Sequence, residues 1–201
     1  MKKNEEYLIN YAELCREADR LEPEMFDKYE VQRGLRDKNG NGVVTGLSNI
    51  SRIDSFRMVD GVKTPCEGKL WYRGYDCIEL VNGFRRKRFG FEEIAYLLLF
   101  GKLPSESQLK EFRDSLSANR TLPTNFTRDV IMKAPSSDIM NSLTRSVLTL
   151  ASYDKNCNDT GIENVLRQCL GLISVFPMLA VYGYHAYNHY EQDSSMYIHR
   201  P

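Results

Sequence analysis

The sequence predicts an all-α fold that carries a small β-hairpin near its N-terminus. Residues 91–100 are apolar at most positions and are followed by Gly101 and Pro104, a pattern typical of a helix that is buried on most faces and then stops. Apolar residues recur at helical spacing through most of the remaining chain. Only two short runs, 43–53 and 69–72, have the composition of β-strands. We therefore expect several helices packed around 91–100 and a single hairpin.

The bulk composition is that of an ordinary globular protein. Of the 201 residues, 42% are hydrophobic and 27% are charged, and the formal net charge is zero. A neutral chain has no overall attraction for nucleic acid or anionic lipid, and no run approaches the roughly 18 apolar residues of a membrane span. Residues 1–6 lack the apolar segment of a signal peptide. We expect a cytoplasmic protein with neither nucleic acid nor a membrane as a partner.

The spacing of the cysteines does not indicate a disulfide framework. They are odd in number, widely spread and without a C-x-x-C pair, so we interpret them as buried or incidental thiols. A disulfide framework or a zinc site is the less favoured alternative. The five residues are Cys15, Cys66, Cys77, Cys157 and Cys169.

The N-terminal segment is expected to be helical. Residues 4–20 place their apolar side chains on one helical stripe, which predicts an amphipathic helix. Pro23 interrupts this pattern, and a short second helix is expected at 25–31.

A turn and the hairpin follow. Residues 34–42 contain two Asn-Gly pairs, which favour positive φ and predict a tight reversal. The strand 43–53 then pairs with the strand 69–72 across a loop at 54–68. The turn letters D-K-N-G-N-G also fit the first half of an EF-hand calcium loop. Its twelfth position should be glutamate but is Ser48, and the flanks are β-prone, so the plain turn is the better interpretation.

From residue 91 onward the pattern is that of helices joined by short connections. A polar linker is expected at 154–160, and Pro177 should either kink the last helix or divide it in two. Residues 136–138 have the composition of an N-terminal cap. Beyond the buried helix, the predicted helices span about 104–119, 123–133, 139–151 and 161–190.

No self-contained active site is visible in the residues. The chain has no G-x-S-x-G, no P-loop and no G-x-G-x-x-G motif, so no catalytic residue and no metal ligand is assigned. His185 and His189 share a helical face. Two imidazoles alone do not complete a zinc site, so we interpret this pair as the polar end of a helix. His199 stands alone.

Two further clusters have a structural and a functional interpretation. The basic run R-R-K-R at 85–88 is interpreted as a solvated loop, with a phosphate-bearing partner as the alternative. Tyr72, Arg73 and Tyr75 could line a site, although a packed and hydrogen-bonded turn is the favoured interpretation.

Two stretches carry a resemblance to a known family. Residues 68–75 are G-K-L-W-Y-R-G-Y, and residues 91–104 are F-E-E-I-A-Y-L-L-L-F-G-K-L-P. In this order and spacing they resemble the N-terminal part of the citrate synthases, where the region is G-x-L-x-Y-R-G-Y and then F-E-E-x-A-Y-L-L-L-x-G-x-L-P. The similarity extends over residues 34–190. One departure lies at residues 138–140, which are D-I-M where the family has an H-P-M triplet.

The resemblance implies a fold and an assembly. Residues 34–201 are expected to form part of a citrate-synthase-like helical large domain, namely its N-terminal part, and residues 1–33 a helical extension. The family's helices that match about 123–134 and 138–154 contribute to a dimer interface. The resemblance therefore implies a homodimer formed through these two segments.

The resemblance also implies an activity for the parent protein. Citrate synthases are acyltransferases of the tricarboxylic acid cycle that condense acetyl-CoA with oxaloacetate to give citrate and CoA, without a permanently bound cofactor. Their catalytic residues lie in motifs such as G-P-x-H-G-G-A-N, which this chain lacks, so the chain alone is expected to be inactive. A 2-methylcitrate synthase and a non-catalytic helical dimerisation module are the alternatives.

One binding residue can be carried over from the family. Arg36, in the G-L-R of residues 34–36, matches an arginine that in some members reaches the CoA phosphates. A guanidinium suits that role because it presents a fork of donors. A structural arginine beside a turn is an equal alternative.

Overall fold

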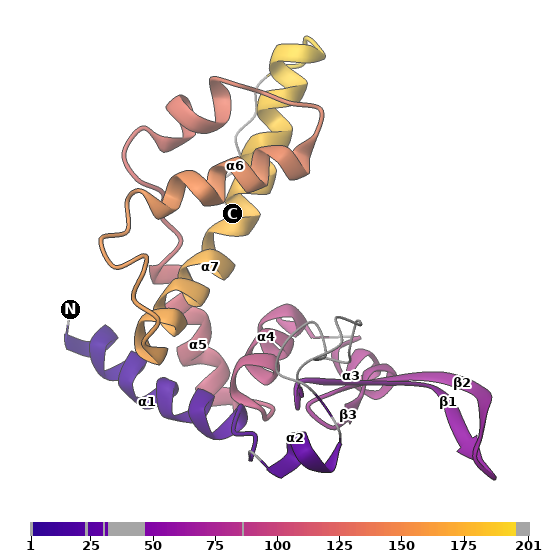
Figure 1. Cartoon of the computed structure of the whole chain (residues 1–201). Helices are drawn as coiled ribbons and strands as arrows, with labels where there is room; N and C mark the ends of the chain where they lie inside the picture. The colour runs from indigo at the N-terminus through magenta and orange to yellow at the C-terminus, as the bar shows by residue number, and fades with distance from the viewer. Residues whose placement is uncertain (1, 23, 30, 32–46, 86, 196–201) are drawn as a thin grey trace, which may run out of the picture. The chain divides into compact units, whose positions relative to one another are not determined.

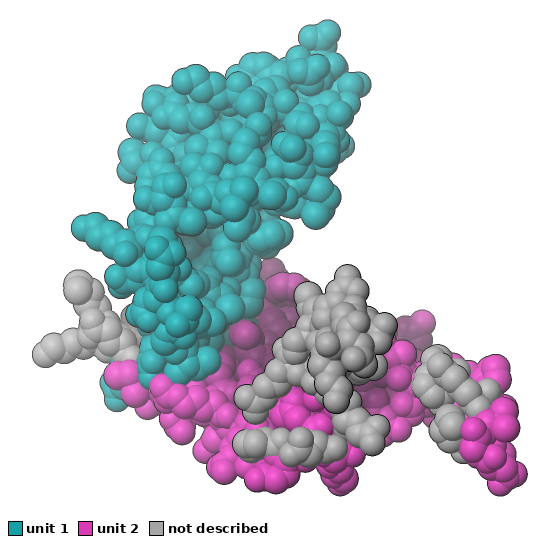
Figure 2. Space-filling view, in the orientation of Figure 1, with its two compact units in different colours: residues 1–8, 111–201 teal, residues 9–110 magenta. Residues whose placement is uncertain are grey.

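The computed structural model contains two compact units, which Figure 2 draws in separate colours. One comprises residues 1–8 and 111–201, and the other residues 9–110. The predicted division into a 1–33 extension and a 34–201 domain stays a prediction. The structure describes residues 2–22, 24–29, 31, 47–85 and 87–195.

The described residues are mostly helical, with one small antiparallel sheet (Figure 1). The predicted fold class is therefore confirmed, and a short third strand joins the hairpin in the order β1-β2-β3. The elements are α1 (Lys2–Ala18), α2 (Glu24–Lys28), β1 (Ser51–Val59), β2 (Val62–Tyr72), β3 (Tyr75–Asp76), α3 (Cys77–Phe84), α4 (Gly90–Phe100), α5 (Glu106–Ala118), the π-helical η1 (Thr127–Met132), α6 (Ile139–Ala151) and α7 (Ile162–Glu191).

The hairpin of β1 and β2 is longer than predicted. The ladder runs from Ser51, which pairs with Tyr72, as far as the two-residue turn at Asp60 and Gly61. These two residues have φ of 50° and 79°, as in the type I′ turns whose twist matches that of paired strands. The expected loop at 54–68 is therefore wrong, because a turn at Asp60 and Gly61 lets these residues continue both strands.

Other N-terminal predictions are corrected or lie outside the described residues. Residues 47–50 precede β1 and are not in a strand, although the sequence suggested one from residue 43. Residues 43–46 lie outside the described residues. The predicted turn at 34–42, with its calcium alternative and Arg36, also lies outside them.

The core of residues 9–110 is an aromatic cluster between α1 and α4. Tyr11 of α1 lies against Tyr96 and Phe100 of α4, with ring centroids 6.1 and 4.8 Å away, and the two α4 rings are 4.6 Å apart. All three side chains are buried. The Cys15 thiol, one turn further along α1, donates to the carbonyl of Leu99 at 3.7 Å. The apolar stripe predicted for the first helix thus packs on the predicted core helix.

Residues at the helix boundaries define where α3 begins and where α4 ends. The Asp76 carboxylate accepts hydrogen bonds from the backbone N–H groups of Ile78 and Glu79, so it caps α3. Gly101 ends α4 in the left-handed conformation, with φ 77°, and its N–H donates to the carbonyl of Leu97 at 2.8 Å. The glycine stop anticipated from the sequence is therefore observed in its expected conformation.

In residues 111–201, η1 and α6 pack against α7 (Figure 1). Small residues allow a close approach: Ser142 and Ser146 of α6 are buried, and a Cβ added at Gly183 of α7 would lie 3.7 Å from that of Ser142. The buried core residues are Phe126, Ile131, Val175, Leu179, Tyr182 and Ala186.

The segment predicted as a helix at 123–133 is shorter and of a different type. The π-helical η1 begins only at Thr127, because Asn125 adopts φ 62°, a left-handed value that no helix accommodates. Phe126 and Ile131 are nevertheless buried, so the apolar positions of the predicted helix do face the core.

The helix α7 is continuous through Pro177. By length and composition alone, this helix could cross a membrane. The expectation that no such run exists is therefore wrong. The core helix of a globular body meets the same criteria, and α7 buries residues along its length against η1 and α6.

Replacing Gly101 with alanine should destabilise residues 9–110. The alanine backbone would have to keep the left-handed φ of Gly101, and its Cβ would lie 3.1 Å from the Cβ of Ala18. We expect a loss of about 1–2 kcal/mol in the free energy of unfolding, measured by urea titration followed by circular dichroism. The control is Gly83→Ala in α3, where an added Cβ meets no atom within 4 Å and stability should not fall. Equal stabilities for the two variants would contradict this account.

Candidate functional site

The side chain of Arg73 is buried at the turn between β2 and β3. Its backbone has φ 48°, and only 3% of its side chain is exposed. Nε and Nη2 donate to the carbonyl of Leu98 at 3.1 and 2.7 Å. Nη1 donates to the carbonyl of Ala18 at 2.9 Å and to Asn49 Oδ1 at 2.7 Å. Nη2 also donates to the Asp19 carboxylate at 2.9 Å.

These partners explain why a charged group is stable there. Ala18 is the last residue of α1, and Leu98 lies in the last turn of α4, so their carbonyls carry the negative partial charge of two helix C-termini. Asp19 adds a full negative charge beside them. Arg73 therefore belongs to a packed, hydrogen-bonded turn, which was the favoured interpretation, and its donors are engaged by the protein itself.

Neither of the two described histidines belongs to a cluster of metal-binding side chains. His189 Nδ1 lies 2.9 Å from the carbonyl oxygen of Ser194, just beyond the end of α7. Within the described ranges, no group of three or more His, Cys, Asp or Glu side chains is placed to bind a metal ion. None of the five cysteines, all of which the structure describes, forms a disulfide.

The basic run is partly engaged by neighbouring side chains. The Lys87 ammonium lies 3.3 Å from the Glu93 carboxylate and 5.9 Å from the ring centroid of Phe84. The Arg88 guanidinium lies 5.6 Å from the ring centroid of Phe89. These contacts suit the interpretation as a surface loop, and a phosphate-bearing partner remains untested.

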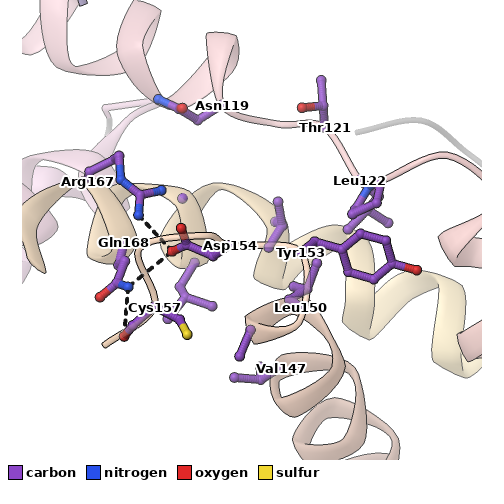
Figure 3. Close-up of a pocket in the computed structure, with 15 residues that line it drawn as sticks. Asn119, Thr121, Leu122, Val147, Leu150, Tyr153, Asp154, Cys157, Arg167 and Gln168 are labelled. Atoms are coloured by element: carbon purple, nitrogen blue, oxygen red, sulfur yellow. Dashed lines mark hydrogen bonds and ion pairs between the residues drawn. The ribbon is translucent and has the colours of Figure 1, made fainter. Parts of the chain in front are cut away.

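A pocket lies within residues 111–201 (Figure 3). Its volume is about 620 Å³. The connection after α5, the C-terminal end of α6, the following linker and the first half of α7 all contribute to it. Its lining residues are Asn119, Thr121, Leu122, Pro123, Val147, Leu150, Ala151, Tyr153, Asp154, Cys157, Arg167, Gln168, Gly171, Leu172 and Val175.

A hydrogen-bonded network forms the polar side of this pocket. Asp154 Oδ2 accepts from Arg167 Nη2 at 2.7 Å and from Gln168 Nε2 at 3.1 Å, as Figure 3 shows. Asp154 Oδ1 accepts from the backbone N–H of Asn156 at 3.0 Å. The pKa of the Asp154 carboxyl lies below its ordinary value, chiefly because Arg167 donates to it and secondarily because Gln168 does. Asp154 is therefore ionised at neutral pH.

Only part of this pocket could be predicted from the sequence. The segment 154–160 was interpreted as a plain linker, and its D-x-N pattern predicts the local turn in which Asp154 caps Asn156. The partner Arg167 lies 13 residues further along the chain. No spacing rule connects an ion pair across a linker and a helix, so this contact was missed.

Comparison with known proteins identifies the family. Residues 38–200 match the model of a family described as citrate synthase, C-terminal domain. The chain belongs to the citrate synthase family. The match agrees with the region of resemblance predicted from the sequence, residues 34–190, and extends it toward the C-terminus.

Individual members of the family give the same result. The chain is 33% identical over 116 residues to a citrate synthase of Saccharolobus solfataricus, covering 57% of this chain and 28% of that protein. It is 24% identical over 164 residues to a citrate/2-methylcitrate synthase of Bacillus subtilis, covering 82% of this chain and 39% of that one. The chain thus spans less than half the length of these relatives.

A solved structure confirms the fold. The citrate synthase of Thermoplasma acidophilum, determined with carboxymethyl-CoA and oxaloacetate, superposes with a TM-score of 0.57 at 19% identity. The superposition covers 78% of this chain and 36% of that one. Since the identity is low, this likeness shows the citrate-synthase-like helical fold and nothing about the site.

Replacing Arg73 should destabilise residues 9–110 even when its charge is kept. Arg73→Lys retains the positive charge, but its ammonium cannot reach both helix ends, so we expect a loss of about 2–4 kcal/mol in the free energy of unfolding, measured by urea titration. The control is Arg52→Lys, since Arg52 pairs with Asp54 on the exposed face of the hairpin and should tolerate the change. Full stability of Arg73→Lys would show that the hydrogen bonds to the two carbonyls contribute little.

Proposed function

We propose that this chain is part of an enzyme that condenses acetyl-CoA with oxaloacetate to give citrate and CoA. The observation that carries the proposal is the family match over residues 38–200, and curated relatives named citrate synthase support it. The similar citrate synthase structure of Thermoplasma acidophilum was determined with carboxymethyl-CoA and oxaloacetate. A CoA thioester and oxaloacetate are the substrates proposed here. Propionyl-CoA as the acyl donor is the second candidate, because relatives named citrate/2-methylcitrate synthase and 2-methylcitrate synthase also match.

The chain supplies the N-terminal part of this enzyme and does not catalyse condensation alone. The stretches that resemble the family are those of its N-terminal part, and the motifs that hold the family's catalytic histidines and aspartate are absent from this sequence. The two described histidines lie on α7, and neither belongs to such a motif. Catalysis then needs residues from outside these 201.

Two further roles belong to the same proposal. Arg36 binds the phosphates of CoA, as the family's G-L-R arginine does in some members. The segments 123–134 and 138–154 form an interface with a second copy. In support, Met140 and Leu148 of α6 are 70% and 69% exposed on the helix face opposite the buried Ser142, although both are large and apolar.

The activity is tested by restoring the missing part of the enzyme. The chain is fused to the remaining C-terminal part of the Bacillus subtilis relative, and loss of the thioester absorbance is followed with acetyl-CoA or propionyl-CoA. We expect no turnover by the chain alone and oxaloacetate-dependent turnover by the fusion. Turnover by the chain alone would contradict the proposal that catalysis needs residues from outside these 201. A folded but inactive fusion would favour a non-catalytic dimerisation module.

The same fusion tests Arg36. If Arg36 binds the CoA phosphates, Arg36→Gln raises the KM for acetyl-CoA by about tenfold, the effect of losing one charge-assisted contact, and leaves kcat unchanged. A structural arginine would instead lower thermal stability and kcat together. The KM for oxaloacetate serves as the internal control, since it should not change.

The dimer is tested by placing charge on the exposed face of α6. We expect the chain to sediment as a dimer and the double variant Met140→Glu/Leu148→Glu to sediment as a monomer, because two carboxylates would be buried in the interface without partners. Ile78→Glu is the matched control, since Ile78 on α3 is 72% exposed and lies in neither segment. A dimer that persists in the double variant would exclude α6 from the interface.

A further inference from the structure

The pocket of residues 111–201 has the size of a small-molecule site and is left open by the chain's own side chains. Its volume of about 620 Å³ falls within the roughly 300–1,000 Å³ typical of such sites. Gly171 of α7 lines it, and a Cβ added there would meet no atom within 4 Å. The helix therefore contributes space at the point where a larger side chain would enter the pocket.

One side of the pocket is apolar. In Figure 3, Leu122, Leu150 and Val147 lie to the right of Arg167 and Gln168, and all three pack against the core of residues 111–201. Leu172 and Val175 of α7 also line the pocket. An occupant therefore gains most of its binding free energy by burying an apolar body here.

The other side offers hydrogen-bond donors. Arg167 uses Nε and Nη2 on Asn164 and Asp154. Its second terminal nitrogen, Nη1, carries two N–H groups that have no hydrogen-bond partner among the residues described. A ligand with one acceptor at this end can be oriented by these donors.

The charges at this end select against an anion. The Asp154 carboxylate lies 2.7 Å from Arg167 and offsets its positive charge. Asp154 is itself fully engaged, since it accepts from Arg167, Gln168 and Asn156. A ligand carboxylate placed here would lose part of its hydration and meet no net positive charge in return. A neutral acceptor such as an amide or ester carbonyl avoids this cost.

We propose that this pocket binds a neutral amphipathic small molecule, with its apolar body against Leu122, Val147 and Leu150 and a carbonyl acceptor facing Arg167. The site lies wholly within one unit of the chain. It does not depend on the proposed condensation, because binding is measured on the chain itself without acyl-CoA or oxaloacetate.

The test uses two pairs of probes that differ in charge. The neutral dye N-phenyl-1-naphthylamine should bind saturably, with enhanced fluorescence, whereas 8-anilino-1-naphthalenesulfonate, which adds a sulfonate, should bind more weakly. Octanamide should displace the neutral dye at a concentration at least about tenfold lower than octanoate does. Equal displacement by amide and carboxylate would overturn the proposed selectivity.

A space-filling variant locates the binding. Gly171→Leu should raise the dissociation constant of the neutral dye by about tenfold or more, because the new side chain occupies the pocket. It should melt at or above the wild-type temperature, since leucine is a better helix former than glycine. The control is Gly68→Leu, another glycine with no atom within 4 Å of an added Cβ, on β2 in the other unit. Unchanged binding by Gly171→Leu would show that the dye binds elsewhere.

A charge variant and a spectroscopic reading complete the test. Asp154→Asn keeps the shape of the side chain but leaves the positive charge of Arg167 unbalanced, so the octanamide preference over octanoate should shrink toward one or reverse. In NMR spectra of the wild-type chain, the backbone amide resonances of Thr121 and Gly171 should shift when octanamide is added. This measurement does not depend on the folding of a variant. An unchanged preference in Asp154→Asn, or shifts confined to other residues, would contradict the proposal.

Discussion

The guanidinium of Arg73 is the interaction on which the architecture of residues 9–110 depends. Burying a charge is costly unless its hydrogen bonds are satisfied, and here it is satisfied by the carboxyl ends of two helices, an amide and a carboxylate. Because one rigid fork contacts α1, α4 and the residues before β1, their separations are defined together. It also holds the left-handed backbone of Arg73 at the hairpin turn.

This network makes α1 part of the core. The helix lies before the region that matches the family model, yet it provides Tyr11 and Cys15 to the contact with α4, and Ala18 to the hydrogen bonds of Arg73. A segment that looks like an appendage by sequence comparison therefore contributes both apolar and polar contacts to the unit. Removing it would leave the guanidinium without the Ala18 carbonyl.

Two glycines of α7 have opposite effects on the packing of residues 111–201. At Gly183, next to Ser142 and Ser146, the lack of bulk lets α6 approach α7 closely. Gly171 lies about three turns earlier in α7. No atom lies within 4 Å of a Cβ added there, so the missing side chain leaves the pocket open. The polar side of that pocket is closed by Asp154 and Arg167, so its charge is balanced locally. The stretches shared with the family are, by contrast, a turn that buries the Arg73 side chain and a core helix, which explains why they identify the family without revealing its chemistry.

The sequence by itself determined the kinds of elements and many of their ends. Asp76, Gly101 and Asp138 act through groups within three or four residues, and the apolar stripes reflect the helical period, so both are encoded locally. It also carried enough of the family pattern to predict the fold. Only the tertiary structure decided how far the hairpin extends, which carbonyls Arg73 reaches and that Asp154 meets Arg167 beside a pocket. Each of these depends on which distant segments pack together, and that choice is made by the free energy of the whole fold, which no local spacing in the chain specifies.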